Sequence, residues 1–187
     1  MEHTIITENI PEIVNIVAGF SVNANLNLSH IAMNAMNCEY NPKKFSAAVL
    51  RLSEPKTTVK IFPKGKISFT GTKTMTECQE ASRKILKVLK KLGYNVHMTD
   101  FKIQNIVANC KVDYEISLYQ LAQDQLEETK YNPERFPGLS YTLTDVKMKA
   151  TIFKNGNVVL LGAKEEETIR EAWRILSDML IKYKRDD

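Results

Sequence analysis

The feature of this chain that most constrains its fold is an internal repeat, because a duplicated sequence unit builds a duplicated structural unit. Blocks of the first half return in the second half at an offset of 90 residues near the start and 91 residues thereafter. The matched blocks are Asn15-Ile16-Val17-Ala18 with Asn105-Ile106-Val107-Ala108, Tyr40-Asn41-Pro42 with Tyr131-Asn132-Pro133, Ile61-Phe62 with Ile152-Phe153, and Gly71-Thr72-Lys73 with Gly162-Ala163-Lys164. We therefore predict a tandem duplication, with a short leader at residues 1–11, a first repeat at residues 12–100 and a second repeat at residues 101–187.

Hydrophobic periodicity predicts the same order of elements in both repeats. Strands are expected at residues 13–22 and 103–112, each followed by a short helix, at residues 30–36 and 118–125. A three-strand meander follows at residues 45–51, 57–62 and 66–70. A long helix closes each repeat, with apolar residues at helical spacing. Its apolar stripe is Ala81, Ile85, Val88, Leu89 and Leu92 in the first repeat, and Ile169, Ala172, Trp173, Leu176 and Leu180 in the second. The pattern predicts an α+β fold, a saddle of one curved antiparallel sheet with the helices on its convex side.

Composition excludes several classes of function. The chain has no apolar run long enough to cross a membrane, so we expect no membrane partner and a cytosolic or nuclear location. Cys38, Cys78 and Cys110 are odd in number and lack the close paired spacing of a zinc site, which favours free thiols with no metal or cofactor. Residues 1–100 carry 13 Lys and Arg against 8 Asp and Glu, whereas the remainder carries 13 against 14. This mild basic excess suits a polyanionic partner, but a solvated basic surface is the more common explanation for it.

The strands leave open which face of the sheet is buried. Alternation puts Thr58, Lys60 and Phe62 on the face opposite Val59 and Ile61, and either set could line the core. One pair of Phe residues stands beside hairpin turns in each repeat, namely Phe45 with Phe62 and Phe136 with Phe153. They are either core aromatics or wedges that unstack bases from the minor groove of DNA.

Asn15 and Asn105 open the matched strands and also allow two interpretations. They are either polar strand residues satisfied locally, or donors to the acceptors that A·T pairs present in the minor groove.

Six blocks of the sequence are distinctive as a set, namely Asn15-Ile16-Val17, residues 39–45 (EYNPKKF), 54–58 (EPKTT), 100–107 (DFKIQNIV), 133–139 (PERFPGL) and Gly162-Ala163-Lys164. Together these blocks resemble the core of the eukaryotic TATA-binding protein family. The resemblance covers roughly residues 12–185. It implies a nuclear general initiation factor, not an enzyme, that binds A·T-rich promoter DNA in the minor groove and bends it by Phe insertion.

Carried over by position, the resemblance implies three groups of contact residues. The residues expected to contact the groove are Asn15, Val17, Phe45, Phe62, Thr70, Asn105, Val107, Phe136, Pro137, Phe153 and Val159. Phosphate contacts are expected from Lys44, Arg51, Lys56, Lys66, Arg135 and Lys147. A protein partner is expected at Glu134, and the basic helix surface with Arg83, Lys84 and Lys87 either docks other initiation factors or is a solvated helix face. The implied partners are transcription factors IIA and IIB, TATA-binding-protein-associated factors and the RNA polymerase machinery. An open face with four Phe and several Val residues would be a large apolar patch, so we also expect a homodimer when DNA is absent.

Departures from the family pattern support other interpretations. Lys60 and Thr151 stand where the family usually has leucine, Ser68 where it has valine, and Leu161 where it has threonine. Basic residues are replaced by Thr142 and Asn157 in the second repeat, and Asn132 and Arg135 alter the segment expected to contact transcription factor IIB. The alternatives are therefore a diverged relative with altered DNA preference and a docking scaffold that uses only its helices.

Overall fold

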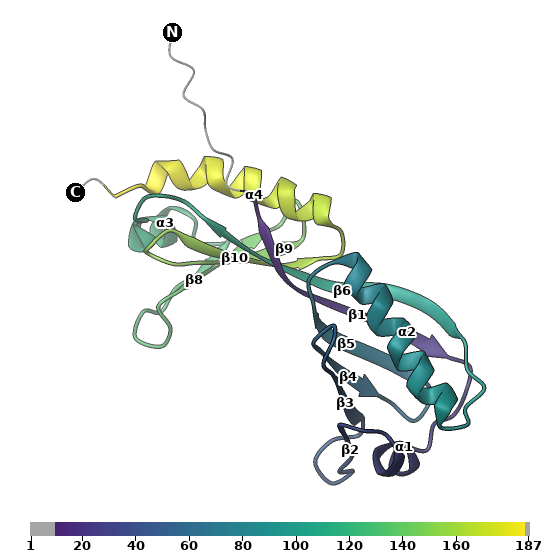
Figure 1. The fold of residues 1–187 in the computed structure, drawn as a ribbon. Helices are drawn as coiled ribbons and strands as arrows, with labels where there is room; N and C mark the ends of the chain where they lie inside the picture. The colour runs from purple at the N-terminus through teal and green to yellow at the C-terminus, as the bar shows by residue number, and fades with distance from the viewer. Residues whose placement is uncertain (1–9, 186–187) are drawn as a thin grey trace. The chain divides into compact units, whose positions relative to one another are not determined.

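The computed structural model describes residues 10–185 as strands and helices in the order that the repeat predicts (Figure 1). The elements of the first repeat are β1 (Glu12–Val22), α1 (Leu28–Asn34), β2 (Cys38–Glu39), β3 (Ala48–Leu52), β4 (Thr57–Ile61), β5 (Lys66–Thr72) and α2 (Met75–Lys91). Those of the second are β6 (Met98–Lys111), α3 (Leu118–Asp124), β7 (Thr129–Lys130), β8 (Leu139–Leu143), β9 (Met148–Ile152), β10 (Asn157–Ala163), α4 (Glu166–Leu180) and the 3-10 turn η1 (Ile181–Tyr183). The predicted leader lies mostly outside the described residues.

The strands form a ten-stranded antiparallel sheet in the order β2-β3-β4-β5-β1-β6-β10-β9-β8-β7. The second half of this order repeats the first half in reverse, with β6 in the place of β1 and β7 in the place of β2. The α+β class and the duplication are therefore confirmed. The chain divides into two compact units, Val14–Asn105 and the part that follows from Ile106, with the first described residues grouped with the latter. The saddle shape stays a prediction.

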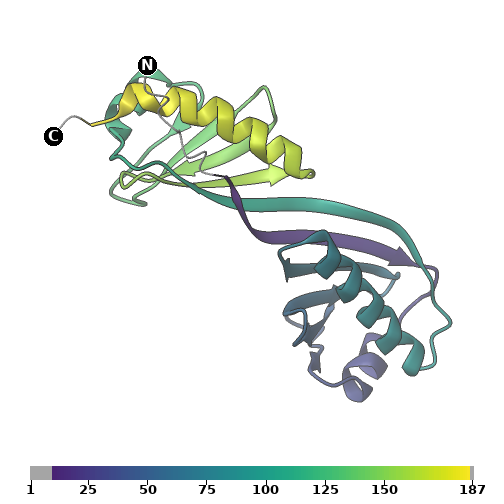
Figure 2. The same cartoon turned by 45° about the horizontal axis from the view of Figure 1, so that its top comes forward.

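In the first unit the buried face of the sheet is the one that α2 covers (Figure 2). Val59 and Ile61 on β4 are fully buried, whereas Thr58 is half-buried and Lys60 is exposed. Alternation on the neighbouring strand agrees, because Phe69 on β5 is also buried. These positions decide the alternative that the sequence left open: the Val59 side lines the core, and the Lys60 side is the open face.

The second unit buries its core in the same way. The buried residues of α4 are Ile169, Ala172, Trp173, Leu176 and Leu180, the whole of the predicted stripe. They cover the side of β8 to β10 that carries Leu139, Ile152 and Leu160. In the first unit the stripe prediction holds less completely, because Val88 and Leu92 are only half-buried.

Capping chemistry sets the start of α2. Thr74 accepts a hydrogen bond from the backbone N–H of Glu77 at 3.1 Å, and the Glu77 carboxylate accepts one from the N–H of Lys73 at 2.6 Å. The first bond satisfies an N–H that the helix start leaves without a partner, as in a capping box, whereas the second is made by the residue before the N-cap Thr74. The helix therefore begins at Met75, well before the first residue of the predicted stripe.

Several element boundaries differ from the prediction, and α1, for example, spans Leu28–Asn34 instead of residues 30–36. The strand expected from Phe45 begins only at Ala48, because the N–H groups of Lys44 and Phe45 both donate to the carbonyl of Asn41 at 3.0 Å and close a turn. Strand β6 begins at Met98, five residues earlier than predicted. The strands β2 and β7 have two residues each, which is too short to leave a periodic signal.

Candidate nucleic-acid interface

The open face of each unit is made of cross-strand rows of side chains, which the strand register defines. In the first unit Lys60 lies opposite Ser68 and Val49, and Thr70 lies opposite Val17 and Thr58. In the second unit the corresponding rows are Ser140, Thr151, Val159 and Asn109, and Thr142, Lys149, Leu161 and Val107. The predicted groove residues Val17 and Thr70 are thus brought together in one unit, and Val107 lies beside Leu161 in the other.

Lys149 is an open-face residue that sequence analysis missed. It is exposed on β9 and lies opposite Thr142 and Leu161. The same register position in the first unit is Thr58, so Lys149 adds a charge that the first unit lacks there. Alternation from Phe153 would have placed Lys149 on this face once the buried side of the strand was known.

The two Phe pairs form at the ends of the open faces. Phe45 and Phe62 meet edge to face with ring centroids 6.3 Å apart, and Phe136 and Phe153 do so at 5.9 Å. Phe45 is 43% exposed and Phe136 is 52% exposed. Interpreting these four residues as buried core aromatics is therefore wrong for the outer member of each pair, and each pair is an exposed aromatic edge.

Gly138 allows the second pair to approach the sheet closely. A Cβ atom at Gly138 would lie 2.7 Å from Cε1 of Phe136, 2.8 Å from Cγ2 of Thr151 and 3.0 Å from Cε1 of Phe153. The equivalent position in the first unit is Ala47, which is buried. Pro137 is exposed between Phe136 and this glycine.

Asn15 is held in a defined orientation by a β-bulge. Its Oδ1 accepts hydrogen bonds from the hydroxyl of Thr70 at 3.0 Å and from the backbone N–H of Gly71 at 2.8 Å. A backbone N–H can only donate, so the atom facing it must be the amide oxygen. The Nδ2 group, with two donors, is then the end of the side chain that remains for a ligand. Asn105 is half-buried at the matched position of β6.

The predicted phosphate-contacting residues are exposed, but they do not all have the same neighbours. Lys44, Lys56, Lys66, Arg135 and Lys147 are exposed, and Lys147 adopts a left-handed backbone conformation with φ of 54°. Arg51 forms an ion pair with Glu39 at 2.8 Å, and both side chains are more than half exposed, at 56% and 66%. Such an exposed pair is weak, so Arg51 can exchange its carboxylate for a phosphate.

The residues predicted for protein partners are all on solvent-facing surfaces. Arg83 and Lys87 are exposed on α2, and together with Leu86, Lys90 and Lys91 they line a shallow hollow of ≈ 480 Å³. Lys84 is more engaged, because its ammonium pairs with Glu80 at 3.0 Å and donates to the carbonyl of Glu54. Glu134 is exposed in the turn before Phe136.

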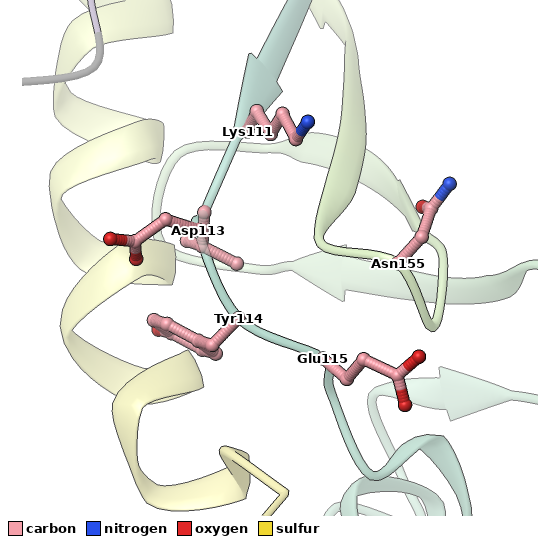
Figure 3. A pocket seen from close by; sticks show the side chains of 6 residues that line it. Lys111, Asp113, Tyr114, Glu115 and Asn155 are labelled. Carbon is pink, nitrogen blue, oxygen red and sulfur yellow. The ribbon is translucent and has the colours of Figure 1, made fainter.

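A second hollow of ≈ 500 Å³ lies at the end of β6 and was not predicted from the sequence (Figure 3). Figure 3 shows Asp113 and Tyr114 pointing toward α4 and Glu115 pointing away from it. Glu115 pairs with Lys154 at 3.3 Å and with Arg185 at 3.4 Å, so its charge is compensated locally. This hollow is separate from the residues that the sequence singled out.

The three cysteines remain free thiols, and burial raises their pKa. The effect is largest for Cys110, whose pKa burial raises to about 12. Among residues 10–185, no group of three or more His, Cys, Asp or Glu could hold a metal ion. No helix in the same range is both long and apolar enough to span a membrane.

Comparison with known proteins identifies the family. The model of the family "Transcription factor TFIID (or TATA-binding protein, TBP)" matches twice, at residues 10–92 and 100–183. TATA-box-binding protein 2 of Entamoeba histolytica is 42% identical over 177 residues, which cover 95% of this chain and 84% of that protein. The TATA-box-binding protein of Saccharomyces cerevisiae is 41% identical over 176 residues, which cover 94% of this chain and 73% of that protein. Among solved structures, Methanococcus jannaschii TBP matches with a TM-score of 0.82 and 38% identity, covering 92% of this chain and 98% of that one. The chain therefore belongs to the TATA-binding protein family and contains two of its repeats.

Proposed function

We propose that this protein is a general transcription initiation factor that binds A·T-rich, TATA-type promoter DNA in the minor groove and bends it by inserting Phe side chains. Its family is one of non-enzymatic DNA-binding factors. The observation that carries the bending step is the pair of exposed aromatic edges, with Phe45 43% and Phe136 52% exposed. Apolar wedges of this kind separate stacked bases from the minor-groove side, which a polar edge would not do.

Recognition of A·T pairs follows from the hydrogen-bonding groups of the open face. The minor groove of an A·T pair offers only the acceptors A N3 and T O2, whereas a G·C pair adds the donor G N2. Asn15 is fixed with its oxygen on Thr70 and Gly71, so its two Nδ2 donors are available to such acceptors. Val17, Val107 and Val159 supply apolar contact to a groove floor that lacks the G amino group. Asn105 supplies the matching amide from the second repeat.

Affinity comes from the basic residues that border the open faces. We assign phosphate contacts to Lys44, Arg51, Lys56, Lys66, Arg135 and Lys147. Each phosphate neutralised by a Lys or Arg releases counterions, so binding weakens as salt rises. If about six phosphates are contacted, affinity falls on the order of a thousandfold between 50 and 200 mM salt.

We also assign the chain to the nucleus, where promoter DNA is located, and give it partners on two surfaces. The basic surface of α2, with Arg83, Lys84 and Lys87, suits acidic surfaces of factors such as transcription factor IIA and the TATA-binding-protein-associated factors. Glu134, exposed beside the Phe136 wedge, is the contact for transcription factor IIB, through which the RNA polymerase machinery is recruited.

A second candidate function is favoured by Lys60 and Lys149, two exposed charges on the open faces. In this alternative the chain is a diverged relative with weak or altered DNA preference, acting mainly as a docking scaffold for proteins. The charges lower the apolar character of the surface, but a lysine is attracted to the negative potential of the minor groove. We therefore place DNA binding first.

Equilibrium binding to A·T-rich and G·C-rich duplexes across a salt series tests the proposal, with dyes on both DNA ends to report bending. The test variant is Phe45→Ala/Phe136→Ala. The matched control is Met33→Ala/Tyr119→Ala, which removes two exposed side chains from α1 and α3, at 78% and 65% exposure, without altering the Phe pairs. Selective, salt-sensitive binding with bending lost only in the Phe variant supports the proposal. If the unaltered protein shows neither selectivity for A·T-rich DNA nor bending, the docking scaffold is favoured.

A further inference from the structure

The matched positions Lys60 and Thr151 carry different chemistry beside equivalent Phe wedges. Lys60 lies on β4, two residues before Phe62, and Thr151 lies on β9, two residues before Phe153. The register places Lys60 opposite Ser68, and Thr151 opposite Val159. Both side chains belong to the open face of their own unit, at the end nearest the Phe pair.

Lys60 contacts its wedge directly, and Thr151 lies close to the other wedge. The ammonium of Lys60 lies 5.4 Å from the centre of the Phe45 ring, in cation–π geometry. Among the described residues, no carboxylate lies within ion-pairing distance of this ammonium, so its charge is not compensated. In the other unit, the methyl of Thr151 and the ring edges of Phe136 and Phe153 border the same space above Gly138. Whatever base pair lies beside each wedge therefore meets Lys60 in one repeat and Thr151 in the other.

The hydrogen-bonding capacities of the two side chains differ in kind. A lysine ammonium has three donors and no acceptor, whereas a threonine hydroxyl both donates and accepts. At an A·T pair the minor groove offers acceptors alone, and both side chains can donate to them. At a G·C pair the amino group of G is a donor. Lys60 would oppose it with a second donor in a groove that excludes water, but Thr151 can accept from it.

We propose that the difference between Lys60 and Thr151 determines the direction in which the protein lies on its DNA site. Lys60 disfavours a G·C pair beside the kink of the first repeat, because the amino donor of G is added to the acceptors there, while Thr151 tolerates a G·C pair beside the kink of the second. A site with a single G·C pair at one end is therefore bound with the second repeat at that end. This inference rests on the proposed minor-groove function and adds the rule by which the protein distinguishes the two ends of a site.

Lys149 does not provide the same discrimination. It is also exposed on the open face of the second unit, but it lies opposite Leu161 and Thr142 instead of beside the Phe pair. It is two residues further from Phe153 along β9, so it meets a different base pair. It is kept unchanged in every variant below, and its effect on orientation cancels between the two duplexes compared.

Energy transfer from the protein to one DNA end tests the proposal. A donor dye is attached at Met33→Cys, an exposed site on α1, in a protein that also carries Cys38→Ser, because Cys38 is the half-buried thiol while Cys78 and Cys110 are buried. Two A·T-rich duplexes differ only in which end carries one G·C pair beside the kink. The ratio of the two orientations is measured on both duplexes, so that any intrinsic preference cancels.

The expected result is an orientation ratio that changes by about tenfold or more between the two duplexes, since one mismatched pair costs about 1–3 kcal/mol. Lys60→Thr gives both ends the same side chain at this matched position and brings this change close to one. The exchanged variant Lys60→Thr/Thr151→Lys has the same net charge and reverses the preferred direction. Both altered positions lie on the open face, and far-UV circular dichroism verifies that each variant is folded.

Two failures are distinguishable. If the unaltered protein binds and bends A·T-rich DNA but the exchanged variant keeps the original direction, the role of Lys60 and Thr151 is wrong and the proposed function stands. If the unaltered protein neither binds nor bends such DNA, the proposed function fails and this inference fails with it.

Discussion

Two bulge glycines at matched positions should respond unequally to the same substitution. Gly71 and Gly162 each occupy the extra position of a bulge, between residues that pair with β1 or with β6, and both have positive φ, 115° and 108°. An L-residue is strained in this region, so Ala at either position costs stability. The two sites differ in what an added Cβ atom would meet.

At Gly71 the Cβ atom would lie 2.5 Å from the backbone carbonyl oxygen of Lys56, which cannot move without shifting a strand end. At Gly162 the nearest atom would be 3.6 Å away, an ordinary contact distance. We therefore expect Gly162→Ala to lower the free energy of unfolding by about 1–2 kcal/mol from backbone strain alone. Gly71→Ala should lose roughly 2 kcal/mol more, because the overlap is added to the same strain.

Urea denaturation followed by two signals measures the difference. The single tryptophan, Trp173, is 8% exposed on α4 and reports on the second unit, where Gly162 lies. Far-UV circular dichroism reports on both units and therefore includes the first. If both variants lose the same free energy of unfolding, the reasoning is refuted, because backbone strain without atomic overlap would then explain both.

The same substitution has a second consequence at the candidate site. The N–H of Gly71 donates to Oδ1 of Asn15 at 2.8 Å, so moving this backbone releases the amide that we assign to A·T recognition. Gly71→Ala should thus weaken selectivity for A·T-rich duplexes at temperatures where it remains folded. Asn15→Ala serves as the reference for complete loss of this contact.

Three further predictions follow from exposed or buried groups. Without DNA, the exposed Phe45 and Phe136 form apolar surface that a homodimer would cover. We expect the unaltered protein to sediment as a dimer at micromolar concentration and Phe45→Ala/Phe136→Ala to shift toward monomer. A strictly monomeric unaltered protein would contradict this prediction. Glu39→Gln should raise DNA affinity a few-fold at low salt by releasing Arg51 from their 2.8 Å ion pair, with little change in stability, whereas Glu80→Gln on α2 should leave affinity unaltered. Burial raises the pKa of Cys110 from 9.0 to about 12 in the folded protein. Below pH 9 the thiol is therefore protonated in both the folded and the unfolded protein. As pH rises from 9 toward 12 only the unfolded protein loses this proton, so the free energy of unfolding should fall by up to about 1.4 kcal/mol per pH unit. Cys110→Ala should have a shallower decline over that range, and an identical slope would show that another group is responsible.

Several features were predictable from the sequence because they depend on local pattern. The duplication, the order of strands and helices, and the buried stripe of α4 require only a repeated offset and helical or strand periodicity. Family resemblance added expected roles for residues such as Asn15 and Phe45. Periodicity failed where an element is very short, as in β2, or where a turn replaces a strand, as at Phe45, because two residues cannot show a period.

What the sequence determined by itself is therefore the fold class and the repeat. The tertiary structure decided which side of each strand faces solvent, because alternation marks two faces but only the packed helix selects the buried one. It also decided that Oδ1 of Asn15 is occupied, that Arg51 is paired with Glu39, and that Lys60 lies over Phe45. The residues of these contacts are 12 to 56 positions apart in the chain. Strand pairing and turns bring such residues together, and these depend on the whole unit rather than on any local pattern.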